Sequence, residues 1–231
     1  MAKTTTVQED PRVQIYIPKI EEAGAVMDQT EHVTINGKTT IIQRGARVEV
    51  PIPVFEALKV KYPDLTLCLG AEILYHQRIA DSISRGACRT LNGTRFVLIE
   101  FLPDDDGDYI VQSVESVAAR GYTPILAHAE RYHDFLSRPG YALSLAEQEI
   151  PIQLNVRSVI GGNGKKVKKF CHLLLKEGAA AVIASDAHDP EYADARLGEG
   201  FRYVSSKFGS EYARSLFCAT PRTFLGLEPK G

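Results

Sequence analysis

Five short apolar runs, each followed by a polar side chain, recur along most of this 231-residue chain. The steps between successive polar residues are 28, 28, 27 and 31 residues, about the length of one strand, one helix and two turns. The runs are rich in Leu, Ile and Val, which is typical of buried strands in a parallel sheet. The period therefore predicts an α/β fold, either a barrel or a doubly wound sheet. The polar residues are Glu72, Glu100, His128, Asn155 and Asp186.

The polar residues should lie close together in space, because the carboxyl ends of parallel strands meet on one rim, where ligands bind. The stretch from Ala181 to His188 shows the pattern most clearly, since an apolar run changes at once into Asp186 and His188. Carboxylates and imidazoles together suit hard and borderline metal ions. We therefore expect one metal-binding cluster, formed by Glu72, Glu100, His128, Asp186 and His188.

Two charged residues, Glu130 and Arg131, follow His128 closely. One interpretation is structural, with Glu130 and Arg131 forming an ion pair at the end of the strand. The other is chemical, because a guanidinium group binds two phosphate oxygens at once. The position at a strand end favours the second interpretation, so Arg131 is a candidate phosphate ligand.

Residues 1–60 have a different pattern. Residues 1–10 are polar and aperiodic, as expected for a disordered tail. Residues 11–60 contain three strand-like segments, and Asn36-Gly37 between two of them is a strong β-hairpin signal. A helix is expected over Val54–Lys61. The segment is similar to a short hairpin found in phage virion-associated proteins, through Val33–Lys38, Arg44-Gly45 and Val48–Pro51.

Two other stretches imitate ligand-binding loops. Asp104–Asp108 is acidic but lacks the spacing of an EF-hand, so we expect Asp108 to cap a helix over Tyr109–Arg120. The glycine-rich stretch beginning at Gly161 lacks P-loop spacing. Its lysines are expected on the solvated face of a helix over Lys165–Lys176, with anion binding as the lesser alternative.

Two histidines outside the expected cluster have ordinary structural explanations. His76 is expected on the surface of a helix over Ile73–Ser84, and His32 is expected to be a solvated or hydrogen-bonded histidine beside a strand.

Composition excludes several classes of partner. The formal net charge is −2 and no block of like charge is long enough for a nucleic-acid-binding tail. No apolar run is long enough to span a bilayer, and the four cysteines lack C-x-x-C spacing. We therefore expect a cytoplasmic protein that neither binds nucleic acid nor inserts into membranes.

Five motifs follow one another in a characteristic order between Tyr62 and Leu227: Gly-Ala-Glu72, Leu-Ile-Glu100-Phe, Ala-His128-Ala-Glu-Arg131-Tyr, Gln153-Leu-Asn155 with Ser158 and Gly161, and Ala-Ser-Asp186-Ala-His188. Together they resemble the PHP-family protein tyrosine phosphatases of bacterial capsule and exopolysaccharide loci. The resemblance implies a cytoplasmic, Mn²⁺-dependent enzyme with a distorted α/β barrel. It also implies a substrate, the phosphotyrosine-bearing tail of the cognate polysaccharide-assembly tyrosine kinase.

The resemblance implies roles for individual residues. Glu72, Glu100 and His128 would hold one metal ion, and Asp186 and His188 would contribute to neighbouring ions. The substrate would be bound by Arg131 and Asn155, with Arg196 as a second candidate arginine.

The chain departs from the family pattern at its N-terminus. The family opens with a His-x-His strand, an Asp-Asp-Gly turn and a second strand ending in histidine, and the chain lacks all three. Of the up to three ions in the family, fewer are expected here, and activity is expected to be impaired. The predicted fold is an incomplete, distorted PHP-type barrel of about five parallel strands over residues 61–231, preceded by the hairpin module of residues 11–60. The alternatives are a catalytically dead pseudoenzyme or binding module, and a phage structural protein.

Overall fold

The computed structural model describes all residues except 1–11, 17–29, 44–46, 65, 187–195 and 228–231. The described residues fall into two compact units, and the chain passes from one to the other between Leu67 and Cys68. Each unit is described by itself.

The N-terminal unit consists of two antiparallel strand pairs and one helix. Strand β1 (Arg12–Tyr16) pairs with β4 (Arg47–Pro51), and β2 (Thr30–Ile35) forms a hairpin with β3 (Lys38–Gln43). Both hairpin turn residues have positive φ, 48° at Asn36 and 76° at Gly37, as a type I′ turn requires. Helix α1 (Ile52–Lys61) follows β4 directly. It contributes Val54 and Leu58 to a small core with Val33, Ile42 and Val50.

The described residues of the second unit contain five parallel strands. Three form one sheet in the order β5 (Glu72–Leu74), β6 (Phe96–Glu100), β7 (Thr123–Leu126), and two form another, β8 (Gln153–Asn155) with β9 (Val182–Ala184). A parallel bridge between Leu126 and Ile152 joins the two groups. Five parallel strands in chain order agree with the α/β expectation.

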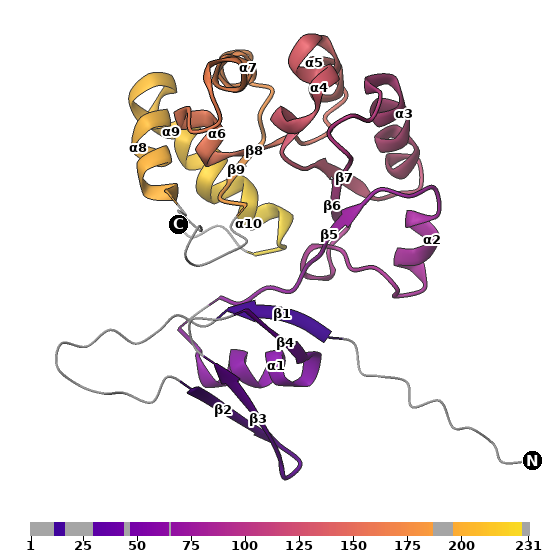
Figure 1. The fold of residues 1–231 in the computed structure, drawn as a ribbon, viewed down its shortest axis with the longest axis vertical. Coiled ribbons are helices and arrows are strands. Elements are labelled where there is room, and N and C mark those ends of the chain that lie inside the picture. Colours follow the sequence, from indigo (N-terminus) through magenta and orange to yellow (C-terminus); the bar gives the residue numbers. More distant parts are fainter. Residues whose placement is uncertain (1–11, 17–29, 44–46, 65, 187–195, 228–231) are drawn as a thin grey trace, which may run out of the picture. The chain divides into compact units, whose positions relative to one another are not determined.

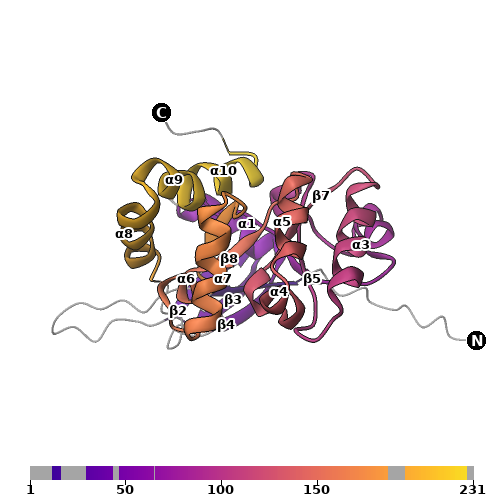
Figure 2. The same ribbon diagram turned by 90° about the horizontal axis from the view of Figure 1, so that it is seen from above.

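Helices cover these strands, and Figures 1 and 2 show α7 between α8 on one side and α5 on the other. Their apolar faces pack on strand residues such as Ile99, Leu126 and Leu154, which are fully buried. The helices are α2 (Ile79–Ser84), α3 (Gly107–Ala118), α4 (His133–Ser137), α5 (Gly140–Glu147), α6 (Val156–Ile160), α7 (Lys165–Lys176), α8 (Leu197–Phe208), α9 (Ser210–Arg214) and α10 (Thr220–Phe224). None of the described helices is long and apolar enough to cross a membrane.

Three predictions about local structure were wrong. The expected strand ending at Glu72 is instead a strand that begins there, because Glu72–Leu74 is the segment that pairs with β6. For the same reason the expected helix over Ile73–Ser84 is confined to Ile79–Ser84. The cap of α3 is Asp106 rather than Asp108, and its carboxylate accepts hydrogen bonds from the backbone N–H groups of Asp108 (2.9 Å) and Tyr109 (3.2 Å).

Candidate metal centre

Three of the predicted ligands form one cluster. Glu72 begins β5, Glu100 ends β6, and His128 lies two residues after β7 in a left-handed conformation with φ 32°. The Nε2 atom of His128 lies 3.0 Å from a Glu72 carboxylate oxygen and 3.4 Å from a Glu100 oxygen. One ligand atom from each of the three residues lies within 4.8 Å of the others. This spacing is compatible with three ligands around a single cation.

His128 is held in place from its backbone side. Its N–H donates to the side-chain oxygen of Gln153 at 2.7 Å, and the Gln153 amide donates in turn to Asn155 Oδ1 at 2.7 Å. The preceding residue, Ala127, accepts a hydrogen bond from the Tyr132 hydroxyl at 2.9 Å. All these groups are buried, so the left-handed turn at His128 is fixed by hydrogen bonds that water does not compete for.

The electrostatics of the cluster suit a cation. Burial, the largest single influence, lowers the pKa of His128, but the carboxylates of Glu72 and Asp186 together raise the pKa above its ordinary value. Within the described part of the chain, His128 Nδ1 is buried without a hydrogen-bond partner, and the buried Nε2 faces the two carboxylate oxygens without a well-directed hydrogen bond to either. Buried polar atoms are normally satisfied. An imidazole nitrogen and two carboxylates that face one another form a ligand set expected for a divalent metal ion.

Arg131 reaches a different acid from the one its sequence neighbourhood suggests. Its guanidinium lies 3.0 Å from Asp186 Oδ2, and the same oxygen accepts a hydrogen bond from the Asn155 side-chain amide at 2.8 Å. The guanidinium side chain is 47% exposed, whereas that of Asp186 is 9% exposed. The guanidinium of Arg131 therefore pairs with a buried carboxylate while part of the side chain stays accessible to an anion from solvent.

Glu130 forms no ion pair with Arg131 among the described residues, so the structural interpretation of that pair was wrong. Its carboxylate is buried, and one of its oxygens accepts a hydrogen bond from the Asn155 backbone N–H at 3.1 Å. Burial raises the pKa of Glu130 above its ordinary value. Glu130 thus anchors the start of α6 beneath the cluster.

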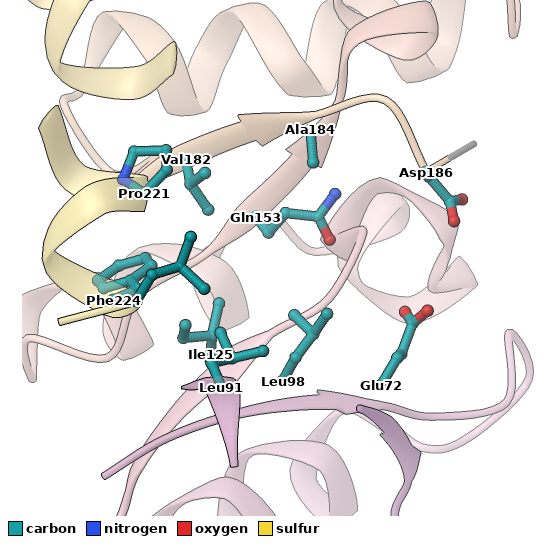
Figure 3. A pocket seen from close by; sticks show the side chains of 11 residues that line it. Glu72, Leu91, Leu98, Ile125, Gln153, Val182, Ala184, Asp186, Pro221 and Phe224 are labelled. Atoms are coloured by element: carbon teal, nitrogen blue, oxygen red, sulfur yellow. The ribbon is translucent and has the colours of Figure 1, made fainter. Parts of the chain in front are cut away.

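A cavity of about 220 Å³ runs from the carboxylates into the interior of the unit. Figure 3 shows Glu72 and Asp186 on the same side of the cavity. The remaining walls are mainly apolar and include Leu98, Ile125 and Phe224. The cluster therefore lies where a polar rim meets an apolar interior.

The outcome for the other predicted residues is mixed. Asn155 lies beside Asp186 through the 2.8 Å hydrogen bond. His188 lies outside the described residues. Arg196 precedes α8 on the surface, with its Nε 3.7 Å from Glu199. Gln153 was part of a quoted motif but was given no role, although two polar residues at alternate positions of a buried strand, Gln153 and Asn155, were a visible signal.

Comparison with known proteins gives a consistent result. The family model described as "Capsular polysaccharide synthesis, CpsB/CapC" matches residues 18–226. Tyrosine-protein phosphatase CpsB of Streptococcus pneumoniae is 27% identical over 179 residues, which are 75% of this chain and 74% of that protein. Tyrosine-protein phosphatase YwqE of Bacillus subtilis (strain 168) is 29% identical over 142 residues, which are 62% of this chain and 56% of that protein.

A solved structure is also similar. It comes from a study of the crystal structures of YwqE from B. subtilis and CpsB from S. pneumoniae, described there as unique metal-dependent tyrosine phosphatases. The identity is 25% and the TM-score 0.68, over 78% of this chain and 72% of the other. The family match begins at residue 18, so it includes much of the N-terminal segment that sequence reasoning had separated from the family.

Proposed function

This chain belongs to the CpsB/CapC family of capsular polysaccharide synthesis, and from that premise we propose that it hydrolyses phosphotyrosine with the help of a bound divalent cation. The observation that carries the proposal is the buried imidazole of His128, whose Nε2 lies 3.0 Å from a Glu72 carboxylate oxygen and 3.4 Å from a Glu100 oxygen. The names of the relatives support the reaction, because CpsB and YwqE are called tyrosine-protein phosphatases.

The proposed metal ligands are Glu72, Glu100 and His128, with Asp186 and His188 contributing to neighbouring ions. A divalent cation bound there, proposed to be Mn²⁺, would supply Lewis acidity toward a phosphoryl oxygen. The chain's own contribution is to hold these ligands rigidly. The side-chain oxygen of Gln153 accepts a hydrogen bond from the His128 backbone N–H at 2.7 Å. Such supporting contacts determine how well a metal ligand is oriented.

Phosphate binding is proposed for Arg131. Its guanidinium has further N–H donors beyond the group that contacts Asp186, and about half of its side chain is exposed. A phosphate dianion from solvent would bind two N–H groups of the planar guanidinium at once, which the single ammonium group of a lysine cannot reproduce. The Asn155 side-chain amide donates a hydrogen bond to Asp186 Oδ2 at 2.8 Å, and so positions the carboxylate with which Arg131 is paired. Arg196 is proposed as a second phosphate ligand.

The proposed substrate is the phosphorylated tail of a capsule-locus tyrosine kinase, encountered in the cytoplasm. Activity is proposed to be weaker than in relatives that carry the His-x-His strand, because fewer ligands are available for the additional ions.

A second candidate function is a phosphotyrosine-binding module with a depleted metal site. It is favoured by a specific observation: the described residues contain a single cluster of three metal-ligating side chains. Such a module would retain Arg131 for phosphate recognition and would lack turnover.

Hydrolysis of a phosphotyrosine peptide, followed by phosphate release with and without Mn²⁺, separates the two functions. The phosphatase proposal expects Mn²⁺-dependent turnover that Glu100→Ala and His128→Ala abolish. Binding of the peptide without turnover above these variants would favour the binding module. A kinase-tail peptide should be cleaved faster than a scrambled peptide of the same composition.

A further inference from the structure

The helices that follow β8 carry an unusual concentration of positive charge. Residues 156–176 contain six Lys and Arg and no Asp or Glu, although the whole chain has a net charge of −2. These residues form α6, a glycine-rich loop and α7. Because no acid lies among them in sequence, any neutralising partner must come from elsewhere.

Four of these cations are exposed and have no ion-pair partner among the described residues. Arg157, Lys165, Lys166 and Lys169 form no ion pair within the part of the chain that the structure describes. Lys168 differs, because its Nζ donates to Ile160 O at 3.1 Å and lies 4.7 Å from the centre of the Tyr203 ring. We call the four free cations the basic surface.

The basic surface lies on the same rim as the candidate metal centre. Strand β8 ends at Asn155 and α6 starts at the next residue, so Arg157 is two positions from the side chain that bonds Asp186. Helix α7 leads back toward the start of β9, so its first residues, Lys165 and Lys166, lie at the rim end. The lysine at the other end of α7, Lys176, is directed away from the rim by the same topology.

Hydrogen bonds tie the basic surface to the cluster. The backbone N–H of Asn155, the residue before α6, donates to the buried Glu130 carboxylate at 3.1 Å, and Ser158 of α6 accepts a hydrogen bond from Asn163 in the glycine-rich loop at 2.9 Å. The Arg157 side chain lies over that loop, because a Cβ built on Gly162 would come within 2.6 Å of its Cγ. The loop, α6 and the turn containing Arg131 therefore form one connected frame.

We propose that the basic surface binds an acidic peptide segment next to the phosphotyrosine that Arg131 engages. This inference rests on the proposed function, and it adds a preference for substrates with Asp or Glu beside the phosphorylated residue. The argument is charge complementarity, since unpaired cations beside a site attract acidic partners and raise the association rate. Residues 156–176 contain one Phe, Phe170, and no Tyr or Trp. Phe170 is buried. Stacking on nucleobases is therefore not favoured by this surface.

The test uses two phosphotyrosine peptides of equal length, one with Asp and Glu flanks and one with Asn and Gln at those positions. We expect the acidic peptide to have a kcat/KM about three- to tenfold higher at low salt, a preference that fades as salt screens the charges. Lys165→Gln/Lys166→Gln should remove the preference and leave kcat for the neutral peptide unchanged. The control with a matched charge change within the same unit, Arg85→Gln/Lys176→Gln, should retain it, because both exposed cations lie where their helices, α2 and α7, end away from the rim.

Binding of the unphosphorylated versions, followed by fluorescence anisotropy, keeps the test valid without turnover. If neither phosphopeptide is hydrolysed, the proposed function fails, but tighter binding of the acidic peptide that depends on Lys165 and Lys166 would still support the basic surface. Equal kcat/KM and equal Kd for the two peptides would overturn the inference. So would loss of preference in the control variant, or lysine-dependent binding to phosphatidylserine vesicles with no preference between the peptides.

Discussion

Replacement of Gln153 by methionine tests whether the network behind His128 holds the site. The side chain is buried and makes two hydrogen bonds of 2.7 Å, one from the His128 N–H and one to Asn155 Oδ1. Gln153→Met keeps the length of the side chain but leaves both groups without a partner. Each orphaned buried group costs about 1–3 kcal/mol, and the extra apolar surface offsets about 1 kcal/mol. Two orphaned groups therefore cost about 2–6 kcal/mol, and after the offset we expect a loss of about 1–5 kcal/mol.

The assay is urea denaturation of the metal-free chain, followed by far-UV circular dichroism because the chain has no tryptophan. A matched control is Gln148→Met, which makes the same substitution at an exposed glutamine and should change stability by less than about 0.5 kcal/mol. The reasoning is refuted if Gln153→Met is no less stable than Gln148→Met. In that case the buried groups do not depend on Gln153.

Three further predictions follow from the site and its surroundings. Arg131→Lys should lower kcat/KM for a phosphotyrosine peptide by about 10- to 100-fold, because a point charge cannot replace the guanidinium fork; an unchanged kcat/KM would exclude a phosphate-binding role. Burial and the nearby Lys168 and Lys207 lower the pKa of His172 below 6.5, so its contribution to stability is complete above about pH 6.5 and is lost as pH falls through the lowered value; relative to His172→Gln, the wild-type chain should lose stability in acid, and parallel pH curves would contradict this. Mn²⁺ at about 100 times its Kd should stabilise the chain by about 2.7 kcal/mol, measured by thermal denaturation, and Glu100→Gln should abolish the shift.

Four of the parallel strands, β6 to β9, could be predicted from sequence because an apolar run of β-forming residues precedes a polar residue in each case. Strand β6 matched the expected Phe96–Glu100, and α7 matched Lys165–Lys176. The error at Glu72 has a physical cause. The run from Leu65 to Leu69 has the composition of a strand, but pairing with β6 is a tertiary property, and the segment that pairs begins at Glu72.

The site was predictable as a set of ligands but not as a network. Glu72, Glu100 and His128 follow a spacing that can be read along the chain. The partner of Arg131 could not be read, because Asp186 lies 55 positions away and Glu130 is the nearer acid in sequence. The same applies to Gln153, which reaches a backbone N–H 25 residues away. Such contacts depend on how the strands are ordered, which a local pattern does not contain.

Direct measurement of Mn²⁺ binding tests the central claim, that Glu72, Glu100 and His128 hold a divalent cation. Equilibrium dialysis of the purified chain, with bound Mn²⁺ quantified by elemental analysis, should find at least one ion per chain. His128→Ala should lose that ion while retaining the circular dichroism spectrum of the wild type. Absence of stoichiometric binding, or binding that His128→Ala leaves unchanged, would contradict the account.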